Sequence, residues 1–257
     1  MKRDRGTVTS PVVAMPKLSF AVAIMGRAPS AEGKTRLLRS LGAADGVGLR
    51  RALLTDTLDV IGRVQVASKA FVYTPGDAEA EVGALVPAGT LLLPQRGRDL
   101  GERLHNAFVD LLRGEPDAAL IIGSDLPTLP SRYVELGVEA LERRPAHLVL
   151  GPSPDGGYYL IGLTRPEPRL FEDIPWGTSG VFEKTLERAR ALALRVELLP
   201  EWYDIDSVGD LVRAMRNDEI GDPVRTGAHT RAWLLAAPPE VRAKVIGQTG
   251  LGPRSAC

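Results

Sequence analysis

One carboxylate in this chain follows a buried apolar segment in the manner of an active-site residue. Residues 119–127 read Ala-Leu-Ile-Ile-Gly-Ser-Asp-Leu-Pro. A continuous apolar run bounded by Gly and Pro is typical of a strand buried on both faces of a parallel sheet. Open α/β sheets bind ligands beyond the carboxyl ends of their strands. Asp125 is therefore the first candidate for a metal or phosphate site, although Asp also starts turns and caps helices.

Other carboxylates also end extended segments, namely Asp99, Asp155 and the pair Asp204 and Asp206. Asp155 precedes Gly156 and Gly157, which allow a backbone to approach a ligand closely, but Asp-Gly is equally a hairpin signal. The side chains of Asp204 and Asp206 point to one side if their segment is extended, although Asp206 could instead cap the following helix. A magnesium–phosphate site needs one or two such carboxylates besides the phosphate oxygens.

The segment 26–37 reads most easily as a phosphate-binding loop. It follows an apolar segment, contains glycine and proline, and carries Arg27, Lys34 and Arg36. Cations beside exposed backbone N–H groups suit an anionic ligand. The P-loop pattern lacks its first glycine, because Ala28 stands there, so a P-loop NTPase is a weaker alternative. The remaining alternative is a solvated basic loop.

A tryptophan near the end of the third quarter of the chain is a further candidate. Trp176-Gly177-Thr178-Ser179 precedes a helical pattern, and Ser or Thr at that place is a usual N-cap. A helix N-terminus of this kind could also receive the phosphate or carboxylate of an acceptor. Trp176 is expected either to anchor the core or to form a pocket wall.

Composition limits the kinds of site that are possible. The chain has 257 residues, 44% of them hydrophobic and 25% charged, which allows one large domain or two small ones. Lys+Arg and Asp+Glu are both 32, so no overall field favours nucleic acid or an anionic membrane. One cysteine and three histidines exclude a disulfide framework and a cysteine zinc site and disfavour a histidine-rich one. Any metal should be a hard cation, Mg²⁺ or Mn²⁺, held by carboxylates.

Strands and helices are expected to alternate, which predicts an α/β fold with a mixed, mostly parallel sheet flanked by helices. Strands are expected at 20–25, 70–73, 90–93, 119–122, 147–150, 158–163 and 196–199. Helices are expected at 49–64, 77–85, 100–112, 131–143, 179–192, from 208 onward, 230–235 and 239–246. The direct join of two strands across residues 153–157 predicts one antiparallel strand.

The chain is expected to divide into a leader (1–17), a catalytic domain (18–216) and a partly helical C-terminal extension (217–257). No stretch reaches the roughly 18 apolar residues of a membrane span, and the apolar part of the leader is too short for a signal peptide. A cytoplasmic protein is expected.

Several motifs occur in an order that resembles a known family. They are Ala-Pro…Lys-Thr-Arg-Leu (28–37), Asp-Leu-Gly-Glu-Arg (99–103), Gly-Ser-Asp-Leu-Pro (123–127), Asp-Gly-Gly-Tyr-Tyr-Leu-Ile-Gly-Leu (155–163), Ile-Pro-Trp (174–176) and Tyr-Asp-Ile-Asp (203–206). Over residues 19–215 the chain resembles the bacterial GT-A-like transferases known as arsenosugar-biosynthesis or selenodomain-associated glycosyltransferases. That family is similar in fold to the molybdenum-cofactor and phospholactate guanylyltransferases.

The resemblance implies a Rossmann-like GT-A fold with a nucleotide and a divalent metal near the Gly-Ser-Asp turn. The implied catalytic residues are Asp125 and Asp155, and the implied metal ligands are Asp125, Asp204 and Asp206. Nucleotide phosphates would be bound by Arg27, Lys34, Arg36 and Ser124, and substrate by Gly156, Gly157 and Trp176. The first loop departs from the usual Ala-Pro-x-Pro-Gly form, and Asp125 stands alone where GT-A enzymes have Asp-x-Asp. Both departures leave phosphate geometry and donor choice open.

The expected function is a metal- and nucleotide-dependent transferase, first of all a glycosyltransferase that moves a sugar from a sugar nucleotide to a small-molecule acceptor. The alternative is a nucleotidyltransferase that joins a nucleoside triphosphate to a phosphorylated or carboxylated acceptor and releases pyrophosphate. A P-loop-type NTPase and a degenerate nucleotide-binding protein are weaker alternatives. The expected partners are a nucleotide and a small molecule, with no nucleic acid and no membrane.

Overall fold

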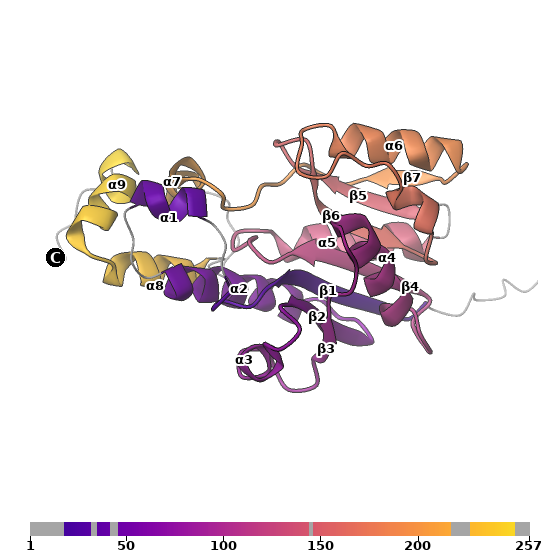
Figure 1. The fold of residues 1–257 in the computed structure, drawn as a ribbon, viewed down its shortest axis with the longest axis horizontal. Helices are drawn as coiled ribbons and strands as arrows, with labels where there is room; N and C mark the ends of the chain where they lie inside the picture. The colour runs from indigo at the N-terminus through magenta and orange to yellow at the C-terminus, as the bar shows by residue number, and fades with distance from the viewer. Residues whose placement is uncertain (1–17, 32–34, 42–45, 144–145, 217–226, 250–257) are drawn as a thin grey trace, which may run out of the picture.

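A computed structural model describes residues 18–31, 35–41, 46–143, 146–216 and 227–249, and it contains one seven-stranded sheet in the order β3-β2-β1-β4-β6-β5-β7 (Figure 1). The strands are β1 (Phe20–Arg27), β2 (Ser68–Thr74), β3 (Leu91–Pro94), β4 (Ala118–Gly123), β5 (Leu148–Pro152), β6 (Tyr158–Leu163) and β7 (Val196–Leu198). β6 pairs antiparallel with both β4 and β5, and every other pairing is parallel. The expected mixed sheet with one antiparallel strand is confirmed.

The helices are α1 (Thr35–Leu41), α2 (Gly46–Gly62), α3 (Glu79–Gly83), α4 (Leu100–Leu111), α5 (Ser131–Glu142), α6 (Val181–Ala191), α7 (Val208–Arg216), α8 (Ala228–Ala236) and α9 (Pro239–Thr249), with a 3₁₀ turn η1 (Pro168–Phe171). Alternate residues of each central strand enter opposite layers. In β1, Val22 and Ile24 pack with α2 and α5, whereas Ala21 and Ala23 pack with α4, η1 and α6. The sheet is thus covered on both faces, which explains its continuous apolar strands.

The order of the strands creates a natural ligand crevice. From β1 the chain builds outward through β2 to β3, and it then returns to place β4 on the other side of β1. The connections after β1 and β4 therefore leave the sheet in opposite directions. Ligands of open α/β sheets bind where this reversal separates two neighbouring loops.

The C-terminal helices pack closely with the sheet domain. α8 contacts α2, and α9 contacts α7, so that α1, α7, α8 and α9 gather at the left end of Figure 1. Leu234, Val241 and Val245 belong to the same buried cluster as Val22 and Ile24 of β1. The segment expected to be a partly helical extension thus shares its core with the sheet, while the domain boundary itself stays a prediction.

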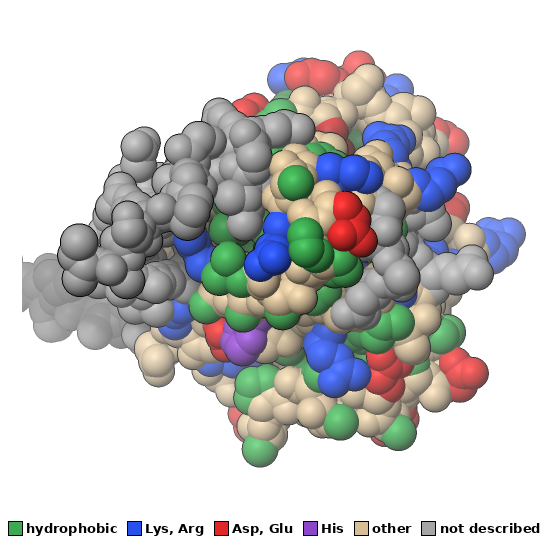
Figure 2. Space-filling view, turned by 90° about the vertical axis from the view of Figure 1, so that its left-hand side faces the viewer, with side chains coloured by type: hydrophobic (Ala, Val, Ile, Leu, Met, Phe, Trp, Pro, Cys, Tyr) green, Lys and Arg blue, Asp and Glu red, His purple; other side chains and the backbone are tan. Residues whose placement is uncertain are grey.

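The surface at this end shows no segregation of charge among the described side chains. In Figure 2 lysine and arginine side chains are scattered between apolar and acidic ones. None of the described helices is long and apolar enough to cross a membrane.

Local details differ from the sequence expectation in several places. α1 begins at Thr35, inside the segment 26–37 that was expected to be a loop. The turn η1 was not predicted, because its four residues are too few to show helical periodicity. α6 begins at Val181 rather than at 179, since Thr178 and its neighbours form a turn in which the Thr178 N–H and hydroxyl both donate to Pro175 O.

Candidate active-site cleft

A cleft of about 370 Å³ lies at the carboxyl ends of β1, β2 and β4. Its apolar wall includes Met25, Leu54 and Leu100. Its polar lining consists of three cations, two carboxylates and smaller polar groups: Arg27, Arg50, Arg103, Asp125, Asp206, Thr74, Gln95 and Ser124. The cleft occupies the β1/β4 reversal, which is the position expected for a ligand in this topology.

The turn that carries Asp125 is held by a buried hydroxyl from α2. Thr57 has no exposed surface, and its Oγ1 accepts a hydrogen bond from Leu126 N at 3.1 Å. The same hydroxyl lies 3.1 Å from Ser124 O and 2.9 Å from Leu53 O, either of which can accept its single proton. Thr57 thus fixes the backbone on both sides of Asp125, and Asp125 itself is half-buried.

The second carboxylate reaches the cleft through an extended segment that follows β7. Leu199 N donates to Leu150 O (2.9 Å) and Trp202 N donates to Pro152 O (3.1 Å), so the segment first follows β5. Ile205 N then donates to Asp125 O at 3.0 Å. This bond brings the backbone of residue 205 beside Asp125, and Asp206 follows as an exposed side chain in the cleft lining.

Capping of the next helix falls to residues other than Asp206. Ser207 Oγ accepts from Asp210 N at 3.2 Å, and Asp210 Oδ2 accepts from Ser207 N at 2.7 Å. This reciprocal pattern is a capping box with Asp in the usual Glu position. The sequence left open whether Asp206 is a cap, and Ser207 and Asp210 perform that role.

Close backbone packing joins the ends of β1, β2 and β4. A Cβ atom at Gly26 would lie 2.4 Å from Ser124 Cβ, so a larger residue cannot be placed there without moving β4. Gln95 Nε2 donates to Gly26 O (2.9 Å) and Val72 O (3.0 Å), which ties the end of β1 to β2. The floor of the cleft is therefore rigid.

Arginines surround the carboxylates and give the cleft its mixed charge. Arg50 Nε donates to Pro29 O at 2.7 Å, and Arg103 Nε donates to Gly97 O at 3.1 Å. Arg27 lies at the exposed end of β1. Guanidinium groups bind phosphate oxygens, and carboxylates bind hard divalent cations. The cleft lining therefore combines groups that suit a phosphorylated ligand with groups that suit a metal ion, and the metal-ligand roles of Asp125 and Asp206 stay predictions.

Some other predicted site residues are not found in the described lining of this cleft. Lys34 falls outside the described residues. Arg36 is exposed on α1 and is absent from the cleft lining, as is the half-buried Asp204. Asp99 is the N-cap of α4 and accepts from Glu102 N at 2.9 Å.

The Asp155-Gly156-Gly157 segment forms a tight turn between β5 and β6. Asp155 is exposed, and its Oδ1 accepts from Gly157 N at 2.9 Å. Gly156 has φ +88°, and a Cβ there would lie 2.1 Å from Ser179 O. Gly156 O also accepts from Phe182 N at 2.8 Å. The close backbone approach that the glycines predicted is thus made to the beginning of α6, and the predicted ligand roles of these three residues stay predictions.

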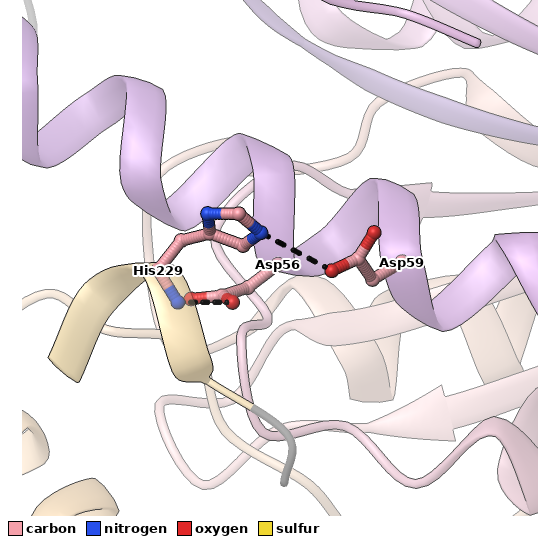
Figure 3. Close-up of side chains that lie close together, drawn as sticks. All are labelled: Asp56, Asp59 and His229. Atoms are coloured by element: carbon pink, nitrogen blue, oxygen red, sulfur yellow. Dashed lines mark hydrogen bonds and ion pairs between the residues drawn. The ribbon is translucent and has the colours of Figure 1, made fainter. Parts of the chain in front are cut away.

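Among the described residues one group of three side chains has potential metal-ligand spacing: Asp56, Asp59 and His229, whose ligand atoms lie within 4.8 Å of one another. Figure 3 shows the two carboxylates on α2 and the histidine at the start of α8. Asp56 is 2% exposed and accepts from His229 N (2.9 Å), Thr230 N (2.8 Å) and the Thr230 hydroxyl (2.6 Å). Burial raises the pKa of the Asp56 carboxyl above its usual value, while these hydrogen bonds lower it. The group could hold an ion, but Asp56 already serves as the cap of α8.

Sequence reasoning missed the roles of Thr57, Arg50, Gln95 and Arg103. Arg103 belongs to the Asp-Leu-Gly-Glu-Arg motif, which was the available signal for it. Thr57 and Arg50 lie on α2 among apolar residues at helical spacing, where the sequence alone gives no indication of a site.

Comparisons with known proteins identify the fold. The sequence profile of a family described as an uncharacterized protein conserved in bacteria (DUF2064) matches residues 57–178. No functionally curated protein matches the sequence. A crystal structure from Desulfovibrio desulfuricans G20, provisionally named a nucleotide-diphospho-sugar transferase, is similar with a TM-score of 0.76 and 28% identity, over 88% of this chain and 97% of that one.

Two more distant structures agree in fold only. CMP:2-keto-3-deoxy-manno-octonic acid synthetase complexed with CTP has 14% identity and a TM-score of 0.52, over 79% of this chain and 100% of its own. Rv0371c from Mycobacterium tuberculosis H37Rv has 15% identity and a TM-score of 0.52, over 77% of this chain and 99% of its own. The chain has the GT-A-like fold of nucleotide-diphospho-sugar transferases, as the sequence predicted.

Proposed function

We propose that this protein is a metal-dependent transferase that uses a nucleotide donor, and that it transfers a glycosyl group from a sugar nucleotide to a small-molecule acceptor. One observation carries the proposal. The β1/β4 cleft brings three arginines and two carboxylates together at the place where an open α/β sheet binds its ligand. The similarity to the Desulfovibrio protein supports the choice of a sugar nucleotide.

The chain's own groups have distinct tasks in this reaction. Arg27, Arg50 and Arg103 would bind the diphosphate and stabilise the charge that develops on it as it leaves. Asp125 and Asp206 would hold Mg²⁺ or Mn²⁺, and a bound ion of this kind supplies further charge stabilisation. Thr57 would keep Asp125 in place through the Ser124–Leu126 backbone.

The bonds that change are those of a substitution at the anomeric carbon of the sugar. An acceptor oxygen forms a bond to that carbon, and the bond from the carbon to the diphosphate oxygen breaks. The electron pair of the broken bond stays on the nucleoside diphosphate, and the proton of the acceptor hydroxyl passes to solvent water. The apolar side chains Met25, Leu54 and Leu100 line the same cleft.

Nucleotidyl transfer is a second candidate, and the three arginines favour it because a triphosphate carries more negative charge than a diphosphate. There the acceptor oxygen attacks the α-phosphorus and pyrophosphate leaves. Product analysis separates the two reactions. The protein is incubated with Mg²⁺ or Mn²⁺, a mixture of sugar nucleotides or nucleoside triphosphates, and an acceptor extract. Release of a nucleoside diphosphate from a sugar nucleotide supports glycosyl transfer. Release of pyrophosphate supports the second candidate, and release of neither contradicts both.

A further inference from the structure

A second cavity lies on the other side of the first turn of α4. It has a volume of about 470 Å³ and is formed between α4 and the segment that runs from η1 toward α6. Its walls include Asp99, Glu102, His105, Phe171, Glu172 and Trp176. We refer to it as the α4–η1 cavity. Trp176, which the sequence expected in the core or in a pocket wall, forms part of this wall and is partly buried.

The α4–η1 cavity adjoins the candidate active site. Leu100 and Arg103 line the β1/β4 cleft, whereas Gly101 and Glu102 line the second cavity. Residues three apart on a helix share a face, so Leu100 and Arg103 present one face to the β1/β4 cleft, while Glu102 and His105 present a different one to the second cavity. A molecule in the α4–η1 cavity would therefore lie across this turn from a donor bound between β1 and β4, and an acceptor hydroxyl would reach the donor past the start of α4.

The aromatic wall is built against the backbone of α4. A Cβ at Gly101 would lie 2.9 Å from Phe171 O and 3.1 Å from Trp176 Nε1, so a larger side chain would displace the wall. An indole offers a flat apolar face, on which the C–H face of a sugar ring can lie, and an N–H that can donate. His105 Nδ1 is buried and has no hydrogen-bond partner among the described residues.

The charge of the wall selects against anions. Its titratable side chains, apart from His105, are the carboxylates Asp99, Glu102, Glu172 and Asp173, and no lysine or arginine lines it within the described part of the chain. Glu102 is paired with Arg98, and Asp173 with Arg188. No ion pair between the described residues involves Asp99 or Glu172, so both carboxylates can accept further hydrogen bonds, although Asp99 Oδ1 already accepts from Glu102 N. Carboxylates accept hydrogen bonds from hydroxyl or amino groups and repel phosphate.

We propose that the α4–η1 cavity binds the acceptor, and that this acceptor is a hydroxyl-rich molecule without a negative charge. The inference rests on the proposed function, and it argues against the phosphorylated or carboxylated acceptor expected for nucleotidyl transfer. Trp176 would support the ring, and Asp99 and Glu172 would accept hydrogen bonds from its hydroxyl groups.

Saturation-transfer NMR with three matched probes tests the chemistry of the cavity, because the method detects weak binding. The probes are glucose, glucosamine, which adds a positive charge, and glucose 6-phosphate, which adds a negative one. We expect a saturation-transfer signal for glucose and glucosamine and little signal for glucose 6-phosphate. A stronger saturation-transfer signal for glucose 6-phosphate than for glucose, or no signal for any probe, would overturn the proposal.

Variants locate the binding. Trp176→Leu should abolish the saturation-transfer signal of glucose, while Trp233→Leu on α8 should leave that signal intact. Glu172→Lys should reverse the preference and raise binding of glucose 6-phosphate by about tenfold, in keeping with one charge-assisted contact. Should Glu172→Lys not fold, Glu172→Gln should still weaken glucosamine binding. Unchanged binding in both Trp176→Leu and the Glu172 variant would overturn the assignment.

A thermal-shift measurement with sugar nucleotides on the same variants separates this inference from the proposed function. Wild type, Trp176→Leu and Glu172→Lys should all show the same nucleotide-dependent shift, because none of these positions lines the β1/β4 cleft. A normal nucleotide-dependent shift, together with glucose binding that is unchanged in Trp176→Leu, would overturn only the proposed acceptor site. Absence of the shift in wild type would overturn the proposed function, even if glucose binding depends on Trp176.

Discussion

The first turn of α4 separates two cavities of similar size and opposite chemistry. The β1/β4 cleft combines arginines with two carboxylates, whereas the α4–η1 cavity combines carboxylates with a tryptophan and a histidine. One space therefore suits a phosphate and a metal ion, and the other suits a hydroxyl-rich molecule. A single helical turn thus presents different chemistry to two spaces, because different faces of the turn line different cavities.

The largest effect is expected from removing the carboxylate of Asp125, which follows β4. Asp125→Asn should lower transfer by about 100-fold or more, because it removes charge stabilisation of the leaving group together with its metal ligand. Steady-state release of nucleoside diphosphate measures the effect. Asp117→Asn is the matched control, since Asp117 precedes the same strand at its other end and accepts from Ser19 N. Equal losses in the two variants would contradict the role given to Asp125.

Removing one cation from the β1/β4 cleft should have a smaller effect on the reaction. Arg27→Gln should raise the KM for the donor about tenfold, the value of one charge-assisted contact at an exposed position, and leave acceptor binding unchanged. Initial rates over a range of donor concentrations test this. Arg113→Gln, beyond the end of α4, serves as a control that alters the same charge elsewhere. A change confined to the acceptor KM would reverse the assignment of the two cavities.

The link between α2 and the Asp125 turn predicts a mixed effect. Thr57→Val keeps the side-chain shape but leaves Leu126 N buried without its acceptor, which costs about 1–3 kcal/mol of unfolding free energy. Urea unfolding measures the loss, and the metal concentration needed for half-maximal activity should rise several-fold. Thr57→Ser keeps the hydroxyl, so its unfolding free energy and its metal requirement should both stay close to those of wild type. Loss of stability with an unchanged metal requirement would show that Thr57 has a structural role only.

The paired carboxylate in the second cavity should have the smallest effect. Hydrogen bonds from Arg98 lower the pKa of Glu102 to about 2, so the stabilisation from ionised Glu102 is present above pH 4.5 and is lost as the pH falls toward 2. Glu102→Gln should therefore reduce the melting temperature slightly at neutral pH and not at all near pH 2. Because the charge is already paired and exposed, its removal should hardly change the preference between glucose and glucose 6-phosphate. A preference that shifts as far as in Glu172→Lys would show that pairing with Arg98 does not shield Glu102.

Much of the fold follows from the sequence because its signals are local. Each of the seven strands is a short apolar or alternating run, and the turn at 153–157 indicates the antiparallel β6. The place of β6 between β4 and β5 depends on long-range pairing and was not predictable. The turn η1 is too short to show a period.

The site was less predictable, because convergence of distant residues has no local signal. Asp125 could be selected from the strand that precedes it, and Arg27 from the loop. Asp206 enters the same cleft only because Ile205 N bonds to Asp125 O, a contact between residues 80 positions apart. Arg50 and Arg103 lie on helices, where an arginine in a cleft and an arginine in solvent look alike in sequence.

The most direct test of the central claim is a thermal-shift measurement of donor binding at the β1/β4 cleft. Wild type, Asp125→Asn and Asp117→Asn are each heated with a panel of sugar nucleotides, with and without Mn²⁺. A ligand that binds only the native state raises the melting temperature according to its concentration and affinity. We predict a Mn²⁺-dependent rise with one sugar nucleotide in wild type and Asp117→Asn, and its loss in Asp125→Asn. An equal rise in all three proteins, or no rise in wild type, would contradict the claim that Asp125 and the cleft arginines bind a metal–nucleotide donor.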